Sequence, residues 1–166
     1  MSALRAVVCV PARDEELLVG RCIRALAAQR GIARDAYEVV LVLDGCTDAT
    51  REQAARAAGD LRLHIIERPP LGVGAARRLG MDVACERLMA AGAPDGLVAT
   101  TDADSEVESG WLAALLEAAE GGARAIGGEV VVEGLAGGVA ERRADRLAAR
   151  LSALPGAAHP HFSGAR

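Results

Sequence analysis

The chain has 166 residues, 19 basic and 23 acidic side chains, a formal net charge of -4 and 51% hydrophobic residues, which fits one folded domain and excludes a disordered chain. Acidic and basic residues are interspersed, so the sequence offers no broad basic surface and we expect no nucleic-acid partner. The longest strongly apolar run, 39–43, is far shorter than the roughly 20 residues of a membrane-spanning helix, and the N-terminus lacks a signal-peptide pattern, so we expect a cytoplasmic protein without a transmembrane segment.

The N-terminal part of the chain predicts a strand, a helix and a second strand. The apolar runs 6–10 and 38–43 are short and are bounded by Pro11 and by Asp44, as expected of buried parallel strands. Between them, apolar residues recur at approximately helical spacing, and Gly31 is suited to end the helix. These apolar residues are Leu17, Leu18, Ile23 and Leu26.

The same alternation continues along the chain. The pattern predicts a helix over 49–58 capped by Thr47 or Asp48, a strand over 61–66, a helix over 75–90, a strand over 97–101 and a helix over 110–120, followed by a Gly-rich strand over 125–132 and an Arg-rich helix over 139–154. This order is typical of an α/β domain with a mostly parallel sheet flanked by helices. The four cysteines are widely spaced without a C-x-x-C pair, so we expect reduced thiols.

Polar or Gly-rich segments follow four of the predicted strands. In an open parallel sheet, ligands bind beyond the carboxyl ends of the strands, near the point where the strand order reverses. The segments are 11–15 (Pro-Ala-Arg-Asp-Glu), 44–48 (Asp-Gly-Cys-Thr-Asp), 72–74 (Gly-Val-Gly) and 102–104 (Asp-Ala-Asp). We therefore expect one binding site at the edge of the sheet where these segments meet.

Asp102 and Asp104 form the acidic pair after the fourth predicted strand. Two carboxylates this close repel each other unless a cation or a proton compensates them. Mg²⁺ and Mn²⁺ prefer oxygen ligands and commonly share a carboxylate site with substrate phosphates, so the pair is a candidate metal site. The alternative is a solvated turn in which the aspartates cap the following helix near Ser105.

Asp44 and Arg77 are further candidates. Asp44 ends an almost wholly apolar strand, so its carboxylate needs a donor such as the ring N–H of a ligand; the alternative is an Asx-turn into the helix near Asp48. Arg77 stands where a dinucleotide fingerprint that begins at Gly72 and Gly74 would have its third glycine, which is a weak signal for a dinucleotide but suits an anionic diphosphate. The alternative for Arg77 is an exposed helix face.

Four motifs between residues 7 and 104 resemble, in the same order, those of the family 2 glycosyltransferases of the GT-A fold. They are Val-Val-Cys-Val-Pro-Ala-Arg-Asp-Glu at 7–15, Leu-Asp-Gly-Cys-Thr-Asp-Ala-Thr at 43–50, Gly-Val-Gly-Ala-Ala-Arg-Arg-Leu-Gly at 72–80 and Thr-Asp-Ala-Asp at 101–104. The resemblance implies a single GT-A (Rossmann-like) domain over 1–166, in which 1–104 is the nucleotide-sugar-binding half and 105–166 is part of the acceptor-side half.

The resemblance also implies roles for individual residues. Pro11, Arg13 and Glu15 would line a nucleotide pocket, and Asp44 would contact the base. Arg77 would lie close to the nucleotide-sugar. Asp102 and Asp104 would bind the metal, with Asp104 as the principal ligand and Asp102 also near the ribose. The implied cofactor is Mg²⁺ or Mn²⁺. The implied reaction is an inverting glycosyl transfer from a nucleoside-diphosphate sugar, with a UDP-sugar favoured.

The chain also departs from the family pattern. Cys46 stands where the family usually has Ser, and after the metal motif the chain is shorter than family members, so it resembles a donor half that lacks much of the acceptor region. No catalytic base is recognisable, because Glu129 and Glu133 match no base motif, and the acceptor stays unknown. His159 and His161 are more typical of a plain loop than of a metal site.

Two other functions stay open. A truncated relative would bind a nucleotide-sugar or a partner protein without catalysis. A nucleotidyltransferase of related architecture is a further alternative, which the absence of glycine from 11–15 disfavours.

Overall fold

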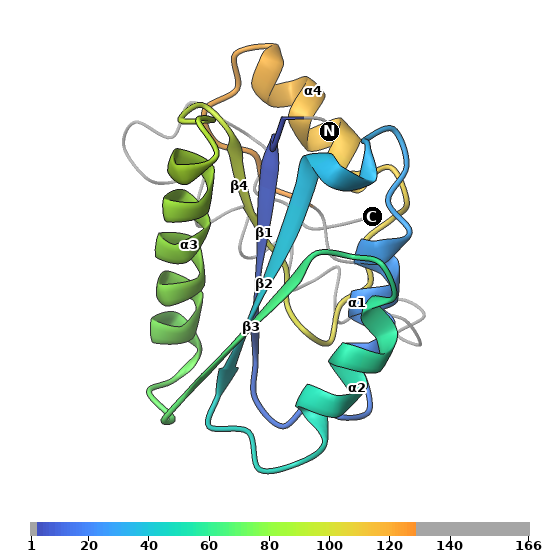
Figure 1. The fold of residues 1–166 in the computed structure, drawn as a ribbon, viewed down its shortest axis with the longest axis vertical. Coiled ribbons are helices and arrows are strands. Elements are labelled where there is room, and N and C mark those ends of the chain that lie inside the picture. The colour runs from blue at the N-terminus through green and yellow to red at the C-terminus, as the bar shows by residue number, and fades with distance from the viewer. Residues whose placement is uncertain (1–2, 129–166) are drawn as a thin grey trace, which may run out of the picture. The chain divides into compact units, whose positions relative to one another are not determined.

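The computed structural model describes residues 3–128, in which strands and helices alternate along the chain (Figure 1). In chain order the elements are β1 (Ala6–Ala12), α1 (Val19–Ala27), the short 3₁₀ helix η1 (Arg34–Ala36), β2 (Tyr37–Asp44), α2 (Thr50–Ala58), β3 (Leu63–Arg68), α3 (Val73–Ala90), β4 (Leu97–Thr100) and α4 (Trp111–Glu120). The strands and helices predicted up to residue 120 are therefore confirmed in type and order, and only their ends differ.

The strands form one parallel sheet in the order β3-β2-β1-β4. β1 and β2 lie in the centre and are buried along their whole length, as their nearly continuous apolar sequences predict. The chain builds the sheet outward from β1 to β3 and then crosses back past β1 to β4, so the strand order reverses between β1 and β4. The predicted α/β architecture, a parallel sheet flanked by helices, is confirmed.

Alternate residues of each strand face opposite sides of the sheet, which produces two separate clusters of buried side chains. One cluster contains Val8, Val10 and Leu41 together with buried residues of α1, α2 and α4. The other contains Val40 and Val42 together with buried residues of α3. Figure 1 accordingly shows α3 on one side of the sheet and the other three helices on the opposite side.

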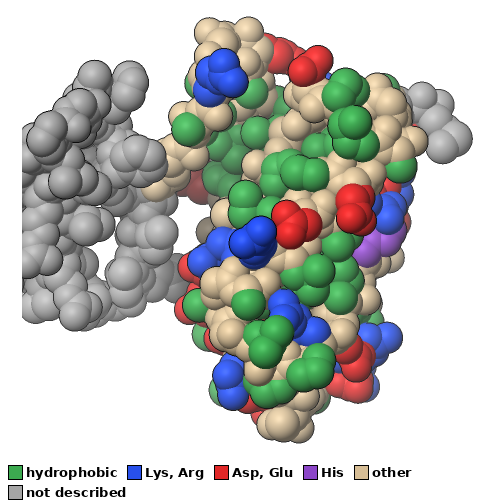
Figure 2. Space-filling model, turned by 90° about the vertical axis from the view of Figure 1, so that its left-hand side faces the viewer, with side chains coloured by type: hydrophobic (Ala, Val, Ile, Leu, Met, Phe, Trp, Pro, Cys, Tyr) green, Lys and Arg blue, Asp and Glu red, His purple; other side chains and the backbone are tan. Residues whose placement is uncertain are grey.

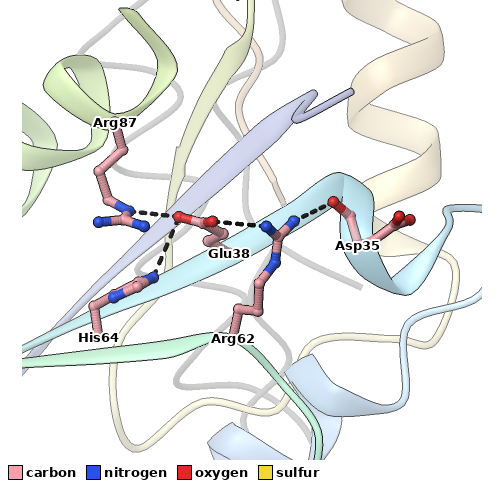
Figure 3. A network of polar contacts seen from close by, with 5 residues as sticks. All are labelled: Asp35, Glu38, Arg62, His64 and Arg87. Atoms are coloured by element: carbon pink, nitrogen blue, oxygen red, sulfur yellow. Dashed lines mark hydrogen bonds and ion pairs between the residues drawn. The ribbon is translucent and has the colours of Figure 1, made fainter. Parts of the chain in front are cut away.

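β2 has an acidic residue at each end of the row that faces α3, Glu38 at the start and Asp44 at the end. Glu38 is 5% exposed, and its carboxylate pairs with Arg87 near the end of α3, with Arg62 at 3.0 Å and with His64 at 3.2 Å (Figure 3). Burial opposes ionisation, but the hydrogen bond and charge of Arg87 hold the pKa of Glu38 below its ordinary value. This network fastens the C-terminal part of α3 to the sheet.

The structure differs from the predictions at two element ends. β1 continues through Pro11, contrary to the expectation that this proline ends the strand. Cys9 and Pro11 direct their backbone groups toward the β4 side of the strand, because the Cys9 carbonyl accepts the N–H of Thr101, just after β4. β4 ends before it reaches Pro11, so the missing N–H of this proline costs the sheet no hydrogen bond. Leu17 and Leu18 precede α1 and are 86% and 38% exposed, so they are not part of its buried face.

The surface over α3 carries hydrophobic side chains among charged ones (Figure 2), with Met81 40% and Met89 64% exposed. Within residues 3–128, no helix is both long and apolar enough to cross a membrane. A compact unit ends at Gly121. Residues 125–128 have no regular secondary structure; the rest of the strand predicted over 125–132, and the whole helix predicted over 139–154, lie outside the described residues, as do Glu129, Glu133, His159 and His161.

Candidate functional site

The loops after β1 and β2 are joined by hydrogen bonds between acidic side chains and backbone amides. Asp14, which has a positive φ of 53°, accepts the N–H of Thr47 at 2.7 Å. Asp48 accepts the N–H of Glu16 at 3.0 Å, and its other carboxylate oxygen accepts the N–H of Thr50, the first residue of α2, at 3.0 Å. The two loops therefore form one connected wall at the C-terminal edge of the sheet.

Glu15 lies in this wall, within electrostatic range of the acidic segment that follows β4. Burial raises the pKa of Glu15, and the nearby carboxylates of Asp104, Asp48 and Asp14 raise it further. Glu15 is partly buried, whereas Asp104 is exposed. The carboxylate predicted to hold a metal is thus an electrostatic neighbour of the loop predicted to line a nucleotide pocket.

Asp102 and Arg77 connect the end of β4 to α3. Arg77 Nη2 lies 2.5 Å from Asp102 Oδ1, and the two side chains are 34% and 58% exposed. On the other side of the chain, the Cys22 thiol of α1 donates to the carbonyl of Asp102 at 3.4 Å. Burial, with the charges of Asp104 and Asp102, raises the pKa of Cys22 to about 12, so this thiol is a neutral donor.

The segment 101–110 is held by Gln29, which lies just beyond the C-terminal end of α1. Gln29 is 8% exposed, its Oε1 accepts the N–H of Leu112 in the first turn of α4 at 2.9 Å, and its Nε2 donates to the carbonyl of Glu108 at 2.8 Å. Because α4 begins only at Trp111, neither Asp102 nor Asp104 caps it. The structure thus does not bear out capping of the next helix by the pair, but it does show the solvated turn of that alternative, with both aspartates exposed and the Ser105 N–H bonded to the carbonyl of Asp102.

Asp44 has its partners within the chain. It is 2% exposed, and its two carboxylate oxygens accept the N–H groups of Leu71 at 2.9 Å and Gly72 at 2.7 Å, while Arg68 Nε lies 3.7 Å from Oδ1. The hydrogen bond from the Leu71 N–H lowers the pKa of Asp44, whereas burial raises it. The Gly72 N–H and the charges of Arg68 and Arg13 also lower it, and the net pKa lies below the ordinary value. Asp44 is therefore a fixed carboxylate that joins the end of β2 to the loop before α3.

The predicted site residues therefore occupy one edge of the sheet. Pro11 is buried at the end of β1, and the exposed Arg13 lies near enough to Asp44 to lower its pKa. Arg77 contacts Asp102, and Asp104 is electrostatically close to Glu15. The arrangement places acidic oxygens and two arginines along the C-terminal edge of the sheet, which includes the point where the strand order reverses, the expected place for a ligand in such a sheet.

The carboxylates at this edge have the chemistry of a divalent metal site. Asp102 and Asp104 offer hard oxygen ligands that are exposed to solvent. Arg77 pairs with Asp102, so the two carboxylates and this guanidinium together keep a net negative charge that can attract a cation. In the part of the chain that the structure describes, one set of three potential ligands lies within 4.8 Å, Asp14, Cys46 and Asp48. Both of those aspartates already accept backbone N–H groups.

A cavity of about 210 Å³ lies beside the site, between α2 and the ends of β2 and β3. Its lining includes Gly45, Arg51, Glu67 and Arg68. Arg51 is exposed and pairs with Glu67 at 2.5 Å. Sequence reasoning did not single out Gln29 or Arg68. Gln29 bonds to backbone groups of Glu108 and Leu112, which are distant in the sequence and leave no motif. Arg68 pairs with Asp44 across two strands, and this pairing depends on the register of the sheet.

Comparison with known proteins identifies a family. The family model described as "Glycosyl transferase family 2" matches residues 7–160. Similar solved structures include residues 1–349 of S. aureus TarS in complex with UDP, with a TM-score of 0.66, 21% identity, and coverage of 82% of this chain and 39% of that chain. The same part of TarS in complex with UDP-GlcNAc has a TM-score of 0.62 and 21% identity, and the match covers 82% of this chain and 38% of that chain. The chain thus spans about two fifths of the length of those structures, and the likeness shows the fold. No curated protein matches the chain.

Proposed function

The chain belongs to glycosyl transferase family 2 and has its GT-A fold, and on that basis we propose that it binds a nucleoside-diphosphate sugar and transfers the sugar to an acceptor. A UDP-sugar is the favoured donor, since the similar TarS structures are complexes with UDP and UDP-GlcNAc. The acceptor and the catalytic base are not assigned, and inversion of configuration is proposed from the family resemblance alone. A cytoplasmic location stays a prediction from the sequence.

One observation carries the proposal, namely the contact of Arg77 with Asp102 at the edge that also carries Asp104. These residues come from α3 and the segment after β4, and the family motifs give them complementary tasks. Asp102 and Asp104 would hold Mg²⁺ or Mn²⁺, and Arg77 would meet the donor diphosphate. Pro11, Arg13 and Glu15 would line the nucleotide pocket.

This arrangement suits departure of a diphosphate. Negative charge grows on the leaving group as the bond to the anomeric carbon breaks, and preorganised positive groups that meet such charge commonly supply the largest catalytic effect. A divalent ion held by Asp102 and Asp104 would supply Lewis-acid stabilisation of that charge. Arg77 would supply a guanidinium from α3, whose planar donors suit phosphate oxygens.

Calorimetric titration with UDP and GDP, with and without Mn²⁺, tests the proposal. We expect UDP to bind, with an affinity that Mn²⁺ increases, and we expect Asp104→Asn to remove the increase. Asp82→Asn is the matched control, because Asp82 is an exposed aspartate of α3 that pairs with Arg78 away from the site. Absence of binding of either nucleotide at millimolar concentration would refute the proposal.

A second measurement separates the enzyme from a module that binds but does not react. Release of UDP from a UDP-sugar that depends on an added candidate acceptor reports transfer, and release without an acceptor reports donor hydrolysis. Metal-dependent UDP binding without any transfer or donor hydrolysis would favour the alternative of a nucleotide-sugar-binding module.

A further inference from the structure

We propose that two buried thiols, Cys9 of β1 and Cys22 of α1, are positioning residues that set the distance between Arg77 and Asp102. The inference rests on the proposed function, in which Arg77 meets the donor diphosphate and Asp102 helps to hold the metal. Cys9 and Cys22 are 0% and 1% exposed, and they match no metal or redox motif. Each thiol acts through the backbone of the site residue that it contacts.

Cys9 connects β1 to the helix that carries Arg77. Its Sγ lies 3.6 Å from the backbone carbonyl oxygen of Arg77, to which the thiol donates. Gly80, one turn further along α3, is buried, and a Cβ placed on it would overlap the Cys9 sulfur. The absence of a side chain at Gly80 thus lets the thiol lie directly against the helix backbone. This contact fixes the second turn of α3, and with it Arg77, relative to β1.

Cys22 connects α1 to the segment that carries Asp102. Its thiol donates to the carbonyl of Asp102 at 3.4 Å, and the residue belongs to the core cluster on the side of the sheet opposite to α3. The next residue of the segment, Ala103, is 3% exposed and lies in the same cluster. The backbone of this segment therefore faces the core, while the Asp102 side chain is directed outward and is 58% exposed.

The two thiols act on the two members of one ion pair. Arg77 Nη2 lies 2.5 Å from Asp102 Oδ1, and Cys9 and Cys22 hold the backbones of these residues from opposite sides of the sheet. The carbonyl of Cys9 also accepts the N–H of Thr101, just before Asp102, at 3.2 Å. Because a carbonyl oxygen can only accept, each contact needs a proton on the cysteine side chain, which a hydroxyl can replace and a methyl group cannot.

The proposed function gives the two contacts different consequences. Groups of a binding site need to be held within roughly 0.5 Å of their working positions by supporting contacts. Asp102 is a proposed metal ligand, so loss of the Cys22 contact should weaken binding of the metal itself. Arg77 is proposed to meet the diphosphate, so loss of the Cys9 contact should weaken binding of the nucleotide and leave binding of the metal intact.

Calorimetric titration of two alanine variants, with Mn²⁺ alone and with UDP at saturating Mn²⁺, separates these consequences. We expect Cys22→Ala to bind Mn²⁺ about threefold more weakly, as for loss of one weak hydrogen bond. We expect Cys9→Ala to bind UDP about threefold more weakly and Mn²⁺ at least as tightly as the unaltered chain does. Cys85→Ala is the matched control, because Cys85 is an exposed thiol of α3. Equal losses of Mn²⁺ affinity in both variants would overturn the proposal, since a general loosening of the fold acts on both alike.

The serine variants give an independent readout, because a hydroxyl keeps the donor. Cys22→Ser should restore the affinity for Mn²⁺, and Cys9→Ser should restore the affinity for UDP. Serine variants as weak as the alanine variants would contradict the inference. Circular dichroism confirms folding, and if one alanine variant does not fold, the other still tests its own half of the pattern.

The outcomes also separate this inference from the proposed function. Failure of the unaltered chain to bind UDP in the presence of Mn²⁺ would overturn both. Binding of Mn²⁺ and UDP by Cys9→Ala and Cys22→Ala with the affinities of the unaltered chain would overturn this inference alone.

Discussion

Replacing Arg77 by Gln should affect binding of a divalent metal and binding of a nucleoside diphosphate in opposite directions. The guanidinium is 2.5 Å from Asp102 Oδ1 and compensates one of the two carboxylates proposed to hold the metal. The two side chains are 34% and 58% exposed, so the pair contributes about 0.5–1 kcal/mol after solvent screening. At 1.4 kcal/mol per tenfold, its removal should strengthen binding of Mn²⁺ alone about two- to fivefold.

The same substitution removes a donor to the diphosphate. A hydrogen bond to a charged group is worth about 1.5–3 kcal/mol, so UDP should bind at least roughly tenfold more weakly to Arg77→Gln at saturating Mn²⁺. Calorimetry at constant ionic strength measures both affinities. Arg78→Gln is the control, because it removes the same charge from a neighbouring, 84% exposed position that pairs with Asp82. Mn²⁺ binding that is unchanged or weaker in Arg77→Gln relative to this control would refute the reasoning.

Three further predictions concern stability, measured by urea unfolding. Glu38→Gln should lower the free energy of unfolding by about 1.5–3 kcal/mol at neutral pH. The folded pKa of Glu38 is lowered from 4.5, so the stabilisation by its carboxylate is present above pH 4.5 and is lost as the pH falls through the folded pKa. The difference in stability between variant and parent should therefore shrink in acid, and a difference that stays constant with pH would contradict this prediction. Gln29→Ala should cost about 1–2 kcal/mol by leaving the start of α4 uncapped, and an unchanged midpoint would argue against that cap. Gly80→Ala places a Cβ 2.1 Å from Cys9 Sγ and should cost about 1–3 kcal/mol; Cys9→Ala should restore part of the loss, and no recovery would exclude this clash.

The sequence predicts the sheet well because its central strands are buried on both faces. Runs such as 39–43 have no polar residue and can occupy only the interior of such a sheet. Element ends depend on contacts that the pattern does not contain. Pro11 stays in β1 because β4 has ended on that side, and Leu17 leaves α1 although its spacing is nearly helical, because Val19 and Cys22 supply the buried face.

The strand-end rule brings the candidate site residues to one edge, but it does not give their partners. It predicts that the segments containing Asp102 and preceding Arg77 lie at the same edge, but it does not predict the contact between these two side chains that the structure shows. The backbone partners of Asp44 and Gln29 could not be predicted, because each lies in a segment distant in sequence, separated by 83 residues for Gln29 and Leu112. The roles of these residues toward a donor stay predictions for the experiments above.

The two acidic residues of β2 also determine how long α3 can be. Six strand steps from Glu38 to Asp44 span about 20 Å, and fifteen helical steps from Gly72 to Arg87 span about 22 Å, so the helix fits between its two attachment points. Inserting or deleting one residue inside α3 would turn everything beyond it by about 100° and detach one end. Natural length variation should therefore fall in the turn over 91–96 and not in the helix, because the separation of Glu38 and Asp44 along β2 sets the length of α3 between its two attachment points.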